Sequence, residues 1–198
     1  MSTVLDTRSR LIEATIEAIA AGGEGSVRVH NIAEQAEVRE PSVYHFFKNR
    51  KELVEAAQAE RYRRSYYEMI LPFKAMASGA TSKQEFLDII LQIFSVMYQQ
   101  DRATSRSTRI NVLGSAQTSK FLSQVVADVN YEISQALAEV FAEAQEKGWV
   151  RTSIDAQMLS LWLMGQVNSR NLPEMDLERS RIEEWDKISL DAVMTFIG

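Results

Sequence analysis

The stretch that decides the fold runs from Val29 to Leu53 and reads VHNIAEQAEVREPSVYHFFKNRKEL. Its first part places apolar residues on one face of a short helix, at Val29, Ile32, Ala33 and Ala36. A short break follows, and Pro41, a residue suited to the first turn of a helix, opens a second short helix. We therefore predict a helix-turn-helix.

Two helices this short need a third helix to bury them. A segment upstream supplies it, because apolar residues recur there at helical spacing before the pair Gly22-Gly23 stops the helix. These residues are Leu11, Ile12, Thr15, Ile16, Ile19 and Ala20. The pattern is typical of a three-helix module that reads DNA.

Residues 7 to 60 resemble the N-terminal domain of the TetR family of transcriptional repressors. The family pattern runs from an Ile-Ala pair through a Val, a Leu-Tyr pair and an aromatic pair ending in Phe to Lys-Glu-x-Leu. The corresponding residues here are Ile32-Ala33, Val38, Val43-Tyr44, Phe46-Phe47 and Arg50-Lys51-Glu52-Leu53. The resemblance implies an all-α protein, with an N-terminal helix-turn-helix domain and a C-terminal helical domain for effector binding and dimerisation.

The composition agrees with an almost wholly helical protein. The 198 residues are 45% hydrophobic, and only three prolines and eight glycines interrupt them, too few for the turns of a sheet protein. The absence of cysteine excludes disulfides, thiolate metal sites and cysteine catalysis. No apolar run is long enough to span a bilayer, and the N-terminus lacks a signal-like segment, so we expect a soluble, cytoplasmic protein without a membrane partner.

The net charge of -5 requires a local basic rim if the protein binds DNA. Arg28 and Arg39 stand at the entries of the two helices, and Lys48 follows the second one. These positions suit phosphate contacts at a modest non-specific affinity.

Further helices are expected along the rest of the chain, nine or ten in total. Asn49 can cap a helix from about Arg50 to Leu71, which Pro72 should end, so we place one domain at 1–71 and the second at 72–198. We expect a loop at 75–81 and a break at Gly114. The remaining helices are expected at about 82–99, 117–147, 154–171 and 177–197.

The candidate DNA contacts lie on or beside the second helix of the motif. Ser42, Tyr44 and His45 carry donors near the part that a helix-turn-helix inserts into the major groove. The resemblance implies phosphate contacts for Tyr44 and Lys48, and contacts to base edges or nearby backbone for Glu40, Pro41, Ser42 and His45. Tyr44 and Phe47 have an alternative role as core aromatics, which we favour for Phe47.

Three features depart from the family pattern. Glu37 replaces the glycine usual in the turn, so it must adopt a left-handed conformation at about 1 kcal/mol or change the turn. Arg28 and Arg39 stand where Ser or Thr usually caps each helix, which removes hydroxyl capping and adds two cations. Pro41 lacks a backbone N–H and biases Glu40 toward an extended conformation.

The second domain carries a candidate effector site. Arg102, Arg106 and Arg109 share one helical face, which could meet an anionic ligand or could be solvated or salt-bridged to neighbours. Aromatic and methionine side chains of the central helices could line a cavity or simply pack. The candidate lining residues are Phe94, Met97, Tyr98, Arg106, Arg109, Ile110, Val125 and Trp162. The implied effector is apolar with a polar or anionic end.

The last two helices carry more apolar side chains than one core can hide, so we expect them to form a homodimer as a four-helix bundle. The interface residues we expect are Met158, Leu161, Trp162, Ile182, Trp185, Ser189 and Phe196.

No catalytic set can be assembled, because both histidines, His30 and His45, lie in the small module and no Gly-rich phosphate loop or metal-spaced cluster occurs. We expect no cofactor, no metal and no enzymatic activity. The resemblance to the TetR family therefore implies a dimeric transcriptional regulator, by default a repressor that a small molecule releases from a palindromic operator. Two alternatives stay open: a helical dimeric interaction module that has lost specific DNA binding, and an all-helical enzyme.

Overall fold

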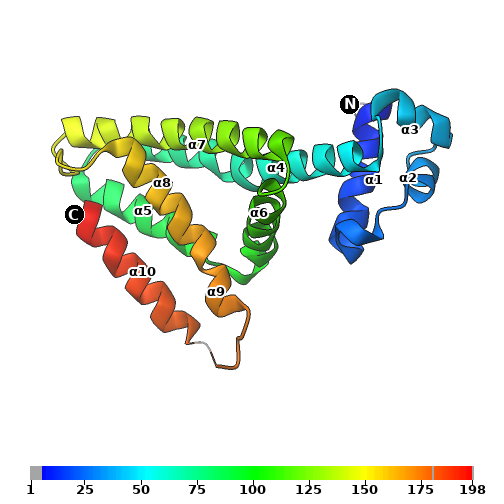
Figure 1. Cartoon of the computed structure of the whole chain (residues 1–198). Coiled ribbons are helices and arrows are strands. Elements are labelled where there is room, and N and C mark those ends of the chain that lie inside the picture. The colour runs from blue at the N-terminus through cyan, green and yellow to red at the C-terminus, as the bar shows by residue number, and fades with distance from the viewer. Residues whose placement is uncertain (1–5, 180, 198) are drawn as a thin grey trace.

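The computed structural model describes residues 6–179 and 181–197, and within them it contains helices and no strand. The N-terminal head comprises α1 (Thr7–Gly22), the 3-10 turn η1 (Glu24–Ser26), α2 (Val29–Gln35) and α3 (Glu40–Phe46). A long helix, α4 (Arg50–Ser78), connects this head to the body (Figure 1). The body comprises α5 (Lys83–Met97), η2 (Gln100–Arg102), α6 (Ala103–Ala116), α7 (Lys120–Glu146), α8 (Ala156–Ser169), α9 (Asn171–Glu174) and α10 (Ile182–Ile197).

The three-helix head has its own core, as the sequence predicts. Apolar side chains of α1, α2 and α3 meet the first turns of α4, and Phe47 is buried among them. The buried members include Leu11, Ile19, Val27, Ile32, Val43 and Leu53. Because this core fixes α3 against the other helices, the opposite face of α3 is held outward.

The turn of the motif accommodates Glu37 in the left-handed conformation, at φ 56°. The amide of Val38 donates to the carbonyl of Ala33 at 2.9 Å, and the amide of Glu37 donates to Glu34 at 3.0 Å. These two bonds form a Schellman motif, which ends α2 and satisfies its last carbonyls. The turn keeps its hydrogen bonds, and Glu37 bears the strain that a glycine would avoid.

The helix starts of the motif and of α4 follow the sequence expectations. Asn49 caps α4 by accepting from the amide of Glu52 at 3.0 Å, whereas neither Arg28 nor Arg39 makes a side-chain capping bond. The two short helices of the motif therefore form without hydroxyl caps, held by the burial of their inner faces.

Several predicted boundaries were wrong. The helix expected to end at Pro72 continues as α4 to Ser78, so the loop expected at 75–81 is helical over most of its length. Phe73 and Ala77 are buried in the body core, and this burial offsets the hydrogen bond that a proline removes from a helix. Gly114 does not break α6, which ends at Ala116.

The C-terminal elements also differ from the sequence expectations. The helix expected to run to about 171 ends at Ser169, and Pro173 lies within the single turn of α9. The last helix begins at Ile182 rather than near 177.

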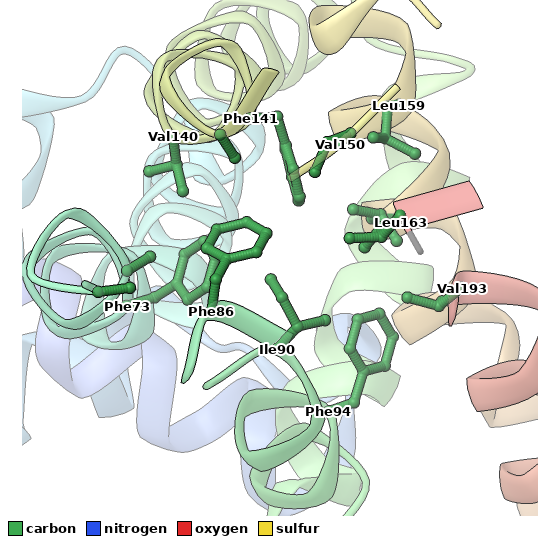
Figure 2. Close-up of a cluster of buried hydrophobic side chains, with 14 of the residues drawn as sticks. Phe73, Phe86, Ile90, Phe94, Val140, Phe141, Val150, Leu159, Leu163 and Val193 are labelled. Atoms are coloured by element: carbon green, nitrogen blue, oxygen red, sulfur yellow. The ribbon is translucent and has the colours of Figure 1, made fainter. Parts of the chain in front are cut away.

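The body is built on α4 and α7, which lie side by side along its length (Figure 1). In the view of Figure 1, α5, α8 and α10 lie mainly below this pair. Figure 2 shows Phe73 and Ile90 facing the space toward Phe141 and Leu163 from the opposite helices. The interior is therefore enclosed by aromatic and branched aliphatic side chains from four helices.

Candidate DNA interface and effector cavity

The outward face of α3 presents most of the predicted DNA contacts. Tyr44 is 50% exposed, and His45 and Pro41 are also exposed, whereas Val43 turns into the head. Ser42 and Glu40 are half-buried. The exposure of Tyr44 contradicts its alternative role as a core aromatic, while the burial of Phe47 agrees with the core role that we favoured.

The predicted cations differ in their availability. Arg39 and Lys48 are exposed, and their side chains have no hydrogen-bond or ion-pair partner in the described ranges. Arg28 is exposed too, but its Nη1 donates to the carbonyls of Gly25 at 2.7 Å and Val27 at 3.2 Å. Two cations are therefore free for phosphates, and the third is partly committed to its own loop.

Glu40 at the start of α3 lies near the other histidine of the head. Its carboxylate is 3.6 Å from Nδ1 of His30 on α2. This contact holds the carboxylate beside the N-terminus of α3.

A polar joint connects the head to the body. Gln58 of α4 is fully buried, and its Nε2 donates to Glu24 of η1 at 2.5 Å and to Asn111 of α6 at 2.9 Å. Ser115 of α6 also donates to Glu24, at 2.7 Å, and Arg61 donates to the Gln58 oxygen at 2.7 Å. The joint thus places head, connecting helix and α6 in one hydrogen-bond network.

The body encloses a cavity of about 90 Å³ accessible to water-sized molecules. Its walls come from α4, α5, α6, α7 and α8, and Arg109 is the single charged residue among them. The lining comprises Tyr66, Ile70, Phe73, Ile90, Ile93, Phe94, Met97, Arg109, Ile133, Leu137, Phe141, Leu163, Met164 and Val167.

Three of the eight predicted cavity residues line it: Phe94, Met97 and Arg109. Tyr98 packs behind the wall, edge-on to Phe94 at 5.7 Å between ring centres. Ile110 is exposed, and Val125 belongs to a separate buried cluster around Tyr62. Trp162 packs edge-on against Phe196 of α10, at 5.0 Å between ring centres.

Arg106 is turned away from the cavity and is neutralised. Its Nε donates to the Glu174 carboxylate at 3.0 Å, and both side chains are buried. Glu174 also accepts from Arg170, which in turn donates twice to Asp186, at 2.7 and 2.9 Å. This network joins α6, α8, α9 and α10, so the ligand role predicted for Arg106 is replaced by a structural one.

Arg109, one helical turn later, has a different environment. Its side chain is 1% exposed, its Nε donates to the hydroxyl of Ser65 at 3.2 Å, and Nη2 donates to the Ser65 carbonyl. The guanidinium lies over the Tyr66 ring, 4.1 Å from its centre. Its Nη1 has no hydrogen-bond partner, and no carboxylate pairs with it in the described residues. Burial lowers the pKa of Arg109 below its ordinary value.

Residues 11–57 match the model of bacterial regulatory proteins of the tetR family. The N-terminal head therefore carries a TetR-type DNA-binding domain. This match covers α1 to α3 and the first turns of α4, the part that carries the candidate DNA contacts.

Solved structures extend the likeness to the whole chain. A Rhodococcus sp. protein classed as a TetR-family transcriptional regulator is 22% identical, with a TM-score of 0.69 over 97% of this chain and 98% of that one. The regulator FadR from Bacillus subtilis in complex with stearoyl-CoA is 18% identical, with a TM-score of 0.64 over 96% and 99% of the two chains. A Saccharomonospora viridis protein classed as a transcriptional regulator, in complex with choline, is 15% identical, with a TM-score of 0.69 over 94% and 95%. No curated protein matches the sequence of this chain.

The C-terminal helices leave an apolar face uncovered. On α8 and α10, Met158, Leu161 and Phe196 are exposed, and Ile188 is 68% exposed. Trp162, Ile182 and Trp185 are half-buried. Ser189, expected at an interface, is buried within the chain. None of the described helices combines the length and apolar character that crossing a membrane requires.

Sequence reasoning missed two groups of site residues. On the α4 part of the cavity wall, Tyr66 and Ile70 fall in a helix that the sequence predicts to end near Leu71, and Phe73 falls beyond it, so the sequence does not predict that α4 lines the cavity. Glu24 and Gln58 were missed as well, because an isolated polar residue normally faces solvent. A polar residue within the apolar stripe of α4 was the available hint for Gln58.

Proposed function

We propose that this chain is a TetR-type transcriptional repressor, which binds a palindromic operator as a homodimer and leaves it when a small molecule occupies the body cavity. The observation that carries the proposal is the position of α6. Arg109 on this helix lines the cavity, and Asn111, two residues further, bonds to the joint with the head. A ligand that moves Arg109 therefore acts on the element that holds Gln58 and Glu24.

The outward face of α3 supports the DNA-binding part of the proposal. The Schellman turn keeps α3 in place, and the free cations Arg39 and Lys48 flank that helix, as phosphate contacts require. These features favour a DNA-reading head over an interaction module that has lost DNA binding. A palindromic site follows from a two-fold dimer that presents two copies of α3.

The dimer part rests on the uncovered apolar face of α8 and α10. Two copies of this helix pair make a four-helix bundle, the arrangement that buries such a face on both subunits at once. A ligand then acts by favouring one arrangement of the two heads, so the match to two half-sites changes with its concentration.

The test is a mobility-shift titration on the DNA upstream of the protein's own gene, compared with random DNA of equal length. We expect tighter binding to the upstream DNA and release by a compound that also raises the melting temperature of the protein alone. A compound at about 100 times its dissociation constant should add roughly 2.7 kcal/mol of stability. Equal affinity for both DNAs would reject the repressor; stabilising compounds that leave the complex intact would reject effector release.

A further inference from the structure

We infer that the effector is a small monocarboxylate with an apolar body, whose carboxylate binds Arg109 inside the body cavity. The inference rests on the proposed effector site and names the chemical class that this site takes. Two observations support it. The two buried arginines of α6 differ in their partners, and the rest of the cavity wall is apolar.

The first step is the unused hydrogen-bonding capacity of Arg109. Ser65 accepts from Nε and Nη2, but Nη1 faces no acceptor in the described structure. Burying a guanidinium without a carboxylate partner costs free energy. Arg106 on the same helix avoids this cost because it forms an ion pair with Glu174. The protein thus neutralises one buried arginine itself and leaves the one at the cavity to a ligand.

The second step concerns the charge of the ligand. Tyr66 covers one face of the guanidinium, so a ligand meets the edge that carries Nη1, the geometry in which arginine binds carboxylates through charge-assisted hydrogen bonds. Arg109 is the single cation of the wall, hence a dianion would bury one charge without a partner. An ammonium ligand would be repelled. A single negative charge fits the wall.

The third step concerns size and shape. Apart from Arg109 and Tyr66, the lining is aliphatic, phenylalanine or methionine, so the remainder of the ligand must be apolar. A cavity of about 90 Å³ holds about six to nine water molecules, which favours a short apolar chain or a single ring. Hexanoate and benzoate are of this size, while a long fatty acid would require the helices to separate.

The test measures binding by titration calorimetry to the full-length protein without DNA. The probes are hexanoate, 1-hexanol and hexylamine, which share one chain, together with benzoate and stearate. We expect hexanoate to bind at least tenfold more tightly than 1-hexanol, benzoate to bind comparably to hexanoate, and hexylamine and stearate to bind much more weakly. Equal binding of hexanoate and 1-hexanol would overturn the carboxylate assignment, and tighter binding of stearate would overturn the size assignment.

Variants test the role of the guanidinium. Arg109→Gln should lower the affinity for hexanoate at least tenfold and change the affinity for 1-hexanol less than twofold. Arg109→Lys should retain part of the preference for hexanoate over 1-hexanol. The matched control is Arg102→Gln, which removes one charge near the start of the same helix but lies outside the cavity lining. Unchanged hexanoate binding in Arg109→Gln overturns the inference. If this variant does not fold, the comparison of acid and alcohol in the unmodified protein decides.

The outcome separates this inference from the proposed function. Arginine-dependent binding of hexanoate without any change in DNA affinity would keep the ligand class and reject effector release. Release of DNA by a neutral compound, with no acid binding, would keep the regulator and reject the ligand class.

Discussion

Gln58 of α4 donates to Asn111 of α6 at 2.9 Å, and the same amide nitrogen donates to Glu24 of η1 in the head. Because Gln58 is fully buried, its amide has no water with which to exchange these partners. A shift of α6 must therefore break a hydrogen bond or carry Glu24 along. This hydrogen-bond network connects α6, which contributes Arg109 to the cavity wall, with the DNA-reading head.

The first prediction concerns that connection. Asn111→Ala removes the α6 acceptor and leaves Glu24 bonded to Gln58, so DNA affinity without effector should stay within about threefold. The effect of the effector on DNA affinity should fall by a factor of five or more, within the range of about 1–3 kcal/mol typical of coupling between sites. Fluorescence anisotropy with labelled operator measures both quantities. Ser107→Ala, an exposed position on the same helix, is the control and should keep full coupling.

The second prediction concerns phosphate contacts. Arg39 is exposed and free of protein partners, so Arg39→Ala should weaken binding to operator and random DNA alike and lower the salt slope by about 1. Arg28→Ala should have a smaller effect, because its Nη1 is occupied by loop carbonyls. Affinity measured across a salt series gives the slope, and an unchanged slope for Arg39→Ala would remove it from the phosphate contacts.

The third prediction concerns base reading. His45 and Ser42 lie on α3 near its outward face, and replacing either by Ala should cost about 1–3 kcal/mol on the operator for each lost base contact. Binding to random DNA should remain nearly unchanged. Competition between operator and random DNA measures the difference, and equal losses on both would reassign these residues to the DNA backbone.

The fourth prediction concerns dimerisation. Ile188→Glu on α10 and Leu161→Glu on α8 each place a charge in the uncovered apolar face and should yield monomers that lose operator binding. Because both positions are exposed in the single chain, the helical content should stay unchanged. Light scattering gives the mass, and Lys187→Glu, an exposed polar neighbour, serves as the control. Dimeric variants would place the interface elsewhere.

The fifth prediction concerns the strained turn. Glu37→Gly removes a left-handed non-glycine residue and should raise the free energy of unfolding by about 0.5–1 kcal/mol, after the entropy cost of glycine is subtracted. Chemical denaturation measures the change. Glu34→Gly lies inside α2 and should instead lower stability by about 0.5–1 kcal/mol, so the two substitutions should have opposite signs.

How much the sequence by itself determined is clearest in the head. Apolar spacing marked α1 and α2, Pro41 marked the start of α3, and Asn49 marked the start of α4, because these signals act within one or two turns of the chain. At Glu37 the sequence left two options, a left-handed residue or a different turn. The structure has the left-handed residue, with the hydrogen bonds of a Schellman motif. Local chemistry was sufficient there.

Only the tertiary structure decided the length of α4 and the roles of the two arginines. Pro72 is a local stop signal, yet burial of Phe73 against the body continues the helix past it. Arg106 and Arg109 are equivalent in sequence, three residues apart on one face. Glu174, which neutralises the first, lies 68 residues further along the chain, and the second faces a cavity assembled from five helices. Neither partner is encoded near the arginines, since the packing of distant helices determines both.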